Sequence, residues 1–325
     1  MFTMDDSNPR PPTRRTRFVC ISDTHNRTVN LPKGDVLIHC GDLTNNGSFT
    51  ELSKQVAWLE NADFECKIVV AGNHDLTLDP AFFAQWGAHF FNGDPQDPVA
   101  CQNLLAQSPS LTYLCHESRT VKLTSPSGPR TRFSVFGSPH SPEHSRAPAW
   151  SAFQYGTSPD GKNEAADALW AQIPLGTDIL VTHGPARTHL DATLRGSLAG
   201  CESLQRAMCR VRPRLAVCGH VHEARGVERV HWDLAGASPP PPDSNNNNND
   251  DDDAREWRDP GAGEGNAKIS LVDLTARGGS PLDNDGSGSR RETCVVNCAV
   301  KVRRPAKTLN KAIVVDLDLP VWEDE

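Results

Sequence analysis

The stretch RFVCISDTH, residues 17–25, decides the fold of this chain. A short apolar run gives way at once to Asp23 and His25, which is typical of a buried strand that ends in a polar loop. The same pattern recurs four times, in DVLIHCGD (35–42), CKIVVAGNHD (66–75), DILVTH (178–183) and RLAVCGHVH (214–222). We therefore expect five buried strands, each followed directly by residues that can carry chemistry.

Helical patterns lie between several of these strands. In residues 50–61 the side chains of Leu52, Val56 and Leu59 share one face, with Thr50 as the candidate cap. Residues 163–172 and 201–210 have a similar pattern. Strands that alternate with helices indicate a layered α/β domain. Five further strands are expected, at residues 119–123, 132–136, 268–274, 293–302 and 312–317.

Three segments do not resemble parts of a folded core. Residues 1–16 form a short arm that we expect to be disordered. Residues 238–266 contain four consecutive prolines, five consecutive asparagines and a run of Asp, and residues 278–291 are rich in Gly, Ser and Asp. Such sequence buries too little apolar surface to offset the entropy of ordering. We therefore expect one domain over residues 17–325, with low-complexity insertions at 238–266 and 278–291.

Composition argues against two classes of partner. The formal charge is −8, whereas nucleic-acid backbones and anionic membranes attract clustered Lys and Arg. The ten cysteines include no CxxC pair, and the sequence contains no apolar signal segment and no apolar stretch long enough to span a membrane. We expect a cytoplasmic protein with free thiols that binds neither membranes nor, stably, nucleic acid. Nothing in the sequence indicates the oligomeric state.

The residues at the strand ends have side chains that bind divalent metal ions. Open α/β sheets place their ligands outside the carboxyl ends of the strands, so these loops should converge on one site. Imidazoles and carboxylates suit borderline divalent ions, and the absence of thiolates argues against a closed structural zinc or iron–sulfur site. In DxH and HxH, the alternate spacing lets both side chains point the same way. The candidate ligands are Asp23, His25, Asp42, Asn73, His183, His220 and His222.

Five elements in this order, DxH…GD…GNHD…H…GHxH, resemble the calcineurin-like metallophosphoesterase superfamily. The resemblance spans about residues 18–231 and requires five ordered matches, each at an expected strand end. Smaller features, LIHCGDLTN, THGP and GHVHEARG, look like the subgroup of metallophosphoesterase-domain-containing proteins known from animal brain. The resemblance implies a four-layer α/β/β/α sandwich and a metal-dependent phosphoesterase. It also implies two divalent metal ions, with manganese favoured over iron or zinc.

Carried over by position, the resemblance gives each residue a role. Two ligand sets are implied, Asp23, His25 and His222 for one metal ion and Asn73, His183 and His220 for the other. Asp42 would bridge both ions. His74 would be the catalytic histidine, which donates a proton or hydrogen bond to the leaving oxygen. Asp75 would orient the ring of His74.

Substrate recognition is less well defined by the sequence. His140 follows an expected strand and His189 follows the THGP turn, so both are candidate substrate-binding residues, with a plain surface loop as the alternative. The implied reaction is hydrolysis of a phosphodiester such as a cyclic nucleotide, and the expected partner is a small phosphoester or nucleotide. A phosphomonoesterase, including a phosphoprotein phosphatase, is one alternative. A nucleotide-binding scaffold with negligible turnover is another, although the complete ligand set argues against it.

Overall fold

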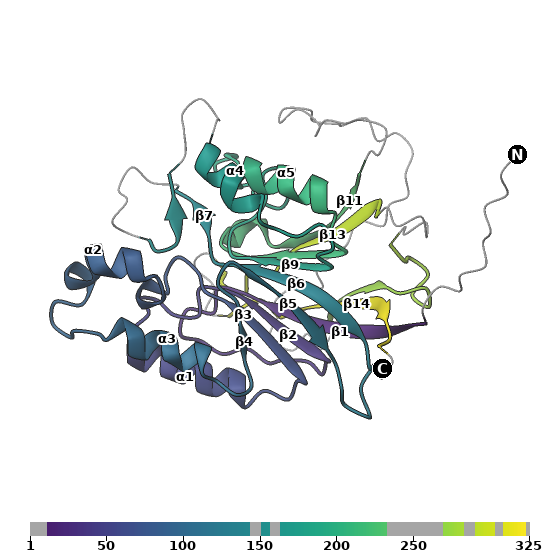
Figure 1. Cartoon of the computed structure of the whole chain (residues 1–325), viewed down its shortest axis with the longest axis horizontal. Coiled ribbons are helices and arrows are strands. Elements are labelled where there is room, and N and C mark those ends of the chain that lie inside the picture. Colours follow the sequence, from purple (N-terminus) through teal and green to yellow (C-terminus); the bar gives the residue numbers. More distant parts are fainter. Residues whose placement is uncertain are drawn as a thin grey trace, which may run out of the picture.

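Two six-stranded sheets form the centre of the molecule (Figure 1). The computed structural model describes residues 12–143, 151–156, 163–232, 269–282, 290–302 and 308–322. In sheet order, the first sheet contains β12 (Ser270–Leu274), β14 (Ile313–Pro320), β1 (Thr13–Ile21), β2 (Val36–Cys40), β3 (Cys66–Val70) and β4 (Thr112–Tyr113). The second contains β11 (Gly226–His231), β13 (Glu292–Asn297), β10 (Leu215–Cys218), β9 (Ile179–Thr182), β6 (Arg132–Ser138) and β5 (Glu117–Lys122).

Helices cover the outer face of each sheet, so the fold has the four layers that the family resemblance implies (Figure 1). On the first sheet lie α1 (Phe49–Glu60), α2 (Pro80–Phe90) and α3 (Pro98–Ala106). On the second lie α4 (Glu164–Trp170) and α5 (Glu202–Val211). The described residues also form two short helical turns, η1 (Leu76–Leu78) and η3 (His222–Ala224), and a two-stranded ribbon of β7 (Ser141–Pro142) and β8 (Gln154–Tyr155). No helix in the described ranges has both the length and the apolar character needed to span a bilayer.

Three apolar layers hold these elements together. Side chains of both sheets interdigitate between them, and the rings of Phe18 and Phe133 meet edge to face across this interface, with centroids 5.4 Å apart. A second layer lies between the first sheet and α1 to α3, and a third lies around Trp170 beneath α4 and α5. Burying these apolar faces against one another is the main favourable contribution to folding.

The strand directions bring the expected ligand loops together. β1 pairs in parallel with β2, and β2 with β3. In the second sheet β9 and β10 are also parallel neighbours. The carboxyl ends of parallel strands lie at the same edge of a sheet, and direct contacts join the two edges. For example, the Nδ1 of His183, after β9, lies 2.8 Å from the carbonyl oxygen of Cys40 at the end of β2.

The structure shortens the expected N-terminal arm. β1 begins at Thr13, so the last residues of the 1–16 segment are strand, paired residue by residue with β14. Thr16 is fully buried, and its hydroxyl lies 2.6 Å from that of Thr131. The expectation of disorder up to residue 16 was wrong because β14 provides a partner strand that local sequence does not reveal.

The expected insertions are only partly within the described residues. Residues 238–266 lie outside them. Of residues 278–291, the described ends are attached to the core, since Leu282 is buried between the sheets and Arg290 forms an ion pair of 2.7 Å with Asp178. The borders of this segment therefore belong to the folded domain.

Candidate metal centre

Four of the seven candidate ligands have a left-handed backbone. The φ angles are 58° at Asp23, 44° at His25, 52° at Asp42 and 65° at His220. Such angles are rare outside glycine, and they concentrate at functional sites where the surroundings hold them. Here the loops after β1 and β2 hold each other, because the amide of Asp23 donates to the carbonyl of Gly41 at 3.0 Å and that of His25 to Asp42 at 3.1 Å.

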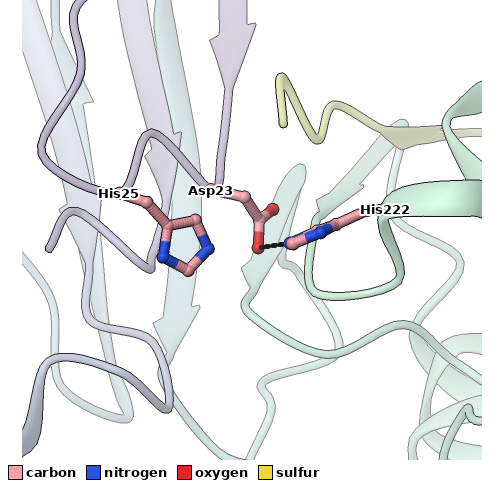
Figure 2. A group of neighbouring side chains, drawn as sticks. All are labelled: Asp23, His25 and His222. Atoms are coloured by element: carbon pink, nitrogen blue, oxygen red, sulfur yellow. Dashed lines mark hydrogen bonds and ion pairs between the residues drawn. The ribbon is translucent and has the colours of Figure 1, made fainter. Parts of the chain in front are cut away.

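Asp23, His25 and His222 form the first cluster (Figure 2). One carboxylate oxygen of Asp23 lies 3.1 Å from the Nε2 of His222, and the amide of His220 donates to the same carboxylate. Burial raises the pKa of the Asp23 carboxyl, but the hydrogen bond from His222 and the neighbouring imidazoles outweigh it, so the pKa lies below its ordinary value. Asp23 therefore stays ionised as a ligand must.

His25 shows most directly that a ligand belongs here. Its side chain is buried, and neither ring nitrogen has a hydrogen-bond partner among the described residues. Burial lowers the pKa of His25 to about 4, so the ring is neutral at physiological pH and one nitrogen has a lone pair. A buried polar atom without a partner is costly. A metal ion bound to this nitrogen removes the cost.

Asn73, His183 and His220 form the second cluster, in which two imidazole nitrogens converge on one amide oxygen. The carbonyl of Cys40 can only accept, so the Nδ1 of His183 carries a hydrogen and its Nε2 is the ring nitrogen that faces Asn73. That Nε2 lies 2.8 Å from the Oδ1 of Asn73, and the Nδ1 of His220 lies 2.9 Å from the same oxygen. A divalent ion satisfies all three groups together, so these residues fit a metal.

Asp42 lies between the two clusters. One of its carboxylate oxygens is 3.5 Å from the Nε2 of His183, and the other is 3.5 Å from the Nε2 of His25. Burial raises the pKa of Asp42, but the charges of His183 and His74 outweigh burial and lower it. An ionised carboxylate that faces both clusters has the geometry of a bridging ligand.

Two glycines allow the loops to approach this closely. A Cβ on Gly72 would overlap the backbone nitrogen and one carboxylate oxygen of Asp42, and a Cβ on Gly219 would overlap the side chains of Ser22 and Asp23. Any other residue at these positions would push a candidate ligand out of place.

His74 lies beside the clusters, and a backbone group holds its ring. Ligating atoms of His74, His25 and Asp42 lie within 4.8 Å of one another. The Nδ1 of His74 lies 3.0 Å from the carbonyl oxygen of Asn45, so Nδ1 carries a hydrogen and Nε2 is left for other chemistry.

Asp75 does not orient His74, and this expectation was wrong. The carboxylate of Asp75 accepts hydrogen bonds from the amide of Gly72 at 2.9 Å, from the amides of Leu43 and Thr44 at 3.2 and 3.0 Å, and from the Thr44 hydroxyl at 2.7 Å. Burial raises the pKa of Asp75 to about 6. Asp75 therefore ties the loop that carries Asp42 to the loop that carries Asn73.

The comparisons with known proteins agree with this geometry. The model of the calcineurin-like phosphoesterase family matches residues 16–224, which include every loop described above. The chain belongs to the calcineurin-like phosphoesterase family. It is 38% identical over 228 residues to metallophosphoesterase domain-containing protein 1 of Homo sapiens, a match that covers 67% of this chain and 64% of the relative.

Two other similarities are more limited. The chain is 40% identical over 220 residues to a probable rhamnogalacturonate lyase C of Emericella nidulans, covering 67% of this chain but only 18% of that protein. Purple acid phosphatase PPD1 of yellow lupin shares 14% identity at a TM-score of 0.39, over 95% of this chain and 50% of that one. The family assignment rests on neither.

The two candidate substrate-binding histidines have different surroundings. The Nδ1 of His140 lies 3.3 Å from the carbonyl oxygen of Phe153. Phe153 follows Ala152, whose amide donates to the Asn73 carbonyl at 3.0 Å. His189 instead faces Glu228 on β11, at 3.0 Å, and is not among the groups of potential ligands in the described residues. Of these two histidines, only His140 contacts the residue next to Ala152, which bonds to Asn73.

Sequence reasoning missed two contributors to the site. The Asn45 carbonyl holds His74, and a backbone carbonyl leaves no residue-type signal. The hydroxyl of Ser151 lies 3.2 Å from the Nδ2 of Asn73, which fixes the amide so that Oδ1 faces the histidines. A single serine in a loop has no sequence signal of its own that marks it as a partner of Asn73.

Proposed function

We propose that this protein is a dinuclear metal-dependent phosphoester hydrolase. Asp23, His25 and His222 would hold one ion, and Asn73, His183 and His220 the other. The placement of Asp42, 3.5 Å from a ring nitrogen of each set, is the observation that carries the proposal. Family membership supports it.

In the proposed hydrolysis, the metal ions and the protein's own side chains have different tasks. When bound, two divalent cations would supply Lewis-acid activation of water and would neutralise charge on the phosphoryl oxygens. Oxygen and nitrogen donors without thiolate fit manganese, which we propose as the native metal, with iron or zinc as alternatives. Asp42 and Asp23, both ionised, fix the positions of the two sets relative to each other.

His74 supplies the proton. With Nδ1–H directed at the Asn45 carbonyl, a protonated ring presents Nε2–H toward the centre, where it donates to the oxygen that leaves phosphorus. Asn45 fixes the ring, and Asp75 fixes the loops on either side of it. A scaffold without turnover would require neither the placement of His74 nor two complete ligand sets.

We further propose a phosphodiester substrate of the cyclic-nucleotide type, in a cytoplasmic protein. Similarity to metallophosphoesterase domain-containing protein 1 supports the subgroup, and the ten cysteines, all free, fit a reducing compartment. A phosphomonoester, including a phosphoprotein, is the alternative substrate.

A hydrolysis panel tests this function. The purified protein, stripped of metal and reloaded with Mn²⁺, should hydrolyse bis(p-nitrophenyl) phosphate and 2′,3′-cyclic nucleotides, and should lose this activity on chelation. Faster turnover of p-nitrophenyl phosphate or phosphoserine peptides would establish the monoesterase alternative. Hydrolysis that persists unchanged with excess chelator would contradict a metal-dependent mechanism.

A further inference from the structure

A polar side chain is buried in an apolar layer close to the metal centre. His39 lies near the end of β2 and is fully buried. Leu37, two residues earlier, packs between the first sheet and its helices. Because side chains two residues apart in a strand point to the same face, His39 points into this layer too. Burying an imidazole there is costly unless its ring nitrogens have partners.

Both ring nitrogens of His39 have partners, and these partners determine where the hydrogen is. The amide of Gly41 donates to Nδ1 at 3.3 Å. Nδ1 therefore has the lone pair, and the hydrogen of the neutral ring is on Nε2, which lies 3.0 Å from the Thr24 hydroxyl oxygen. Burial lowers the pKa of His39 to about 4, which agrees with a neutral ring at physiological pH. The ring thus accepts from the loop after β2 and donates to the loop after β1.

Thr24 continues this chain of hydrogen bonds. Its oxygen accepts from His39, so its hydroxyl can donate, and the carbonyl oxygen of Leu43 lies 3.3 Å away. Gly41 precedes Asp42 and Leu43 follows it, so the two contacts lie on either side of the candidate bridging ligand. Thr24 is also fully buried, and it lies in the middle of the loop that carries two ligands of the first cluster.

The backbone of these loops needs such support. Asp23, His25 and Asp42 all have left-handed φ angles, and residues in this region persist only where the surrounding structure holds them. Backbone hydrogen bonds already join the two loops. His39 and Thr24 add side-chain hydrogen bonds in the buried layer, where each bond is stronger than in water.

We propose that His39 and Thr24 are positioning residues that set the affinity of the first metal ion, because together they hold the loop of Asp23 and His25 against the loop of Asp42. The inference rests on the proposed function for its consequence in hydrolysis. Neither residue is assigned to an ion, so both should act on metal affinity through the ligands.

The test compares Mn²⁺ affinity in paired variants by calorimetry. Thr24→Val replaces the hydroxyl with a methyl group, and Thr24→Ser keeps the hydroxyl. His39→Leu removes both ring contacts, and His39→Gln keeps an amide that can donate toward Thr24. We expect Thr24→Val and His39→Leu to bind one of two Mn²⁺ ions roughly tenfold more weakly, the usual cost of a lost partner around a metal ligand. Thr24→Ser and His39→Gln should recover most of that affinity.

Two background variants assign the effect to one ion. In protein that carries His222→Ala, which disrupts the first cluster, Thr24→Val should cause no further loss of Mn²⁺ affinity. In protein that carries Asn73→Ala, which disrupts the second cluster, Thr24→Val should weaken the remaining ion as it does in the wild type. The opposite pattern would overturn the inference, because Thr24 would then act on the second ion.

Thr16 provides a matched control for lost stability. It lies on β1, is fully buried, and its hydroxyl oxygen lies 2.6 Å from that of Thr131. Thr16→Val should lower the melting temperature as Thr24→Val does, yet bind Mn²⁺ within about twofold of wild type. An equal loss of Mn²⁺ affinity in Thr16→Val would overturn the inference, because any buried hydroxyl would then have the same effect.

Hydrolysis by the same variants distinguishes this inference from the proposed function. Thr24→Val should need roughly tenfold more Mn²⁺ for half-maximal hydrolysis of bis(p-nitrophenyl) phosphate. If wild type hydrolyses phosphoesters but Thr24→Val and His39→Leu bind Mn²⁺ normally, the inference is wrong and the function stands. If wild type hydrolyses none of the panel yet both variants bind Mn²⁺ weakly, the function is wrong and the positioning role stands. If wild type does not bind Mn²⁺, both are overturned.

Discussion

Asp42 and His74 are in contact, yet their loss should have different consequences. The amide of His74 donates to a carboxylate oxygen of Asp42 at 2.8 Å, while the carboxylate faces both clusters. Asp42→Ala should therefore remove metal and activity together. His74→Ala should keep near-normal metal content and lose kcat by roughly 10²–10⁴, the usual contribution of a positioned acid or base.

Two substrates whose leaving groups differ in acidity test whether His74 acts as a proton donor. The His74→Ala defect should be smaller for a nitrophenyl diester, whose leaving group needs little protonation, than for an alkyl diester. Metal content by mass spectrometry and kcat on both substrates measure the two effects. Because His74 is also within ligating reach of His25 and Asp42, loss of metal from His74→Ala would make it a ligand and would refute its role as proton donor.

At the residue scale, the positions of the candidate ligands could be predicted, but not the partners of every side chain. Asp23 and His222 were predictable because each follows an apolar strand at a fixed spacing, and the strand places it. The partners of Asp75 were not, because four donors from two loops compete for its carboxylate and only the folded backbone decides between them.

At the element scale, Asp79 connects a helix start to the site. Its carboxylate caps α2 by accepting from the amides of Ala81 and Phe82, and its other oxygen accepts from the amide of Phe153 at 2.7 Å. Asp97 caps α3 in the same Asp-Pro arrangement, and its carboxylate accepts from the amides of Val99 and Ala100 at the start of that helix. The two residues form a matched pair.

Replacing each with alanine should separate helix stability from site geometry. Both Asp79→Ala and Asp97→Ala should lower the free energy of unfolding by about 1 kcal/mol, the usual cost of a lost N-cap. Only Asp79→Ala should also raise KM several-fold, because the Phe153 amide that Asp79 binds is next to Ala152, which bonds to Asn73. Denaturant unfolding and steady-state kinetics measure both quantities. An equal KM change in the two variants would show that Asp79 acts only through the helix.

Elements with a strong periodic pattern could be predicted, and short or locally ambiguous ones could not. The five buried strands were correct, and α1 was correct except that Ser48 rather than Thr50 caps it. Helices α2 and α3 were missed although Asp-Pro starts both, because their apolar residues are not confined to one face. β11 was missed because its own sequence has no strand pattern. It is a strand because it pairs with β13.

At the scale of the whole molecule, the family resemblance predicts the four layers. The structure shows in addition how the edges of the two sheets are joined. The segment after β13 bonds to the ends of β1 and β10, so one late part of the chain fixes the two sheet edges on which the metal centre lies. No local pattern predicts this, because the partners are far apart in sequence. The low-complexity insertion at 238–266 stays a prediction.

The number of metal ions per chain tests the central claim most directly. Metal-free protein titrated with Mn²⁺ should bind two ions in the wild type. His222→Ala, from the first cluster, and Asn73→Ala, from the second, should each weaken one site, whereas Asp42→Ala should weaken both. Circular dichroism confirms that each variant is folded. A single ion per wild-type chain, or two that bind unchanged in Asp42→Ala, would contradict a dinuclear centre bridged by Asp42.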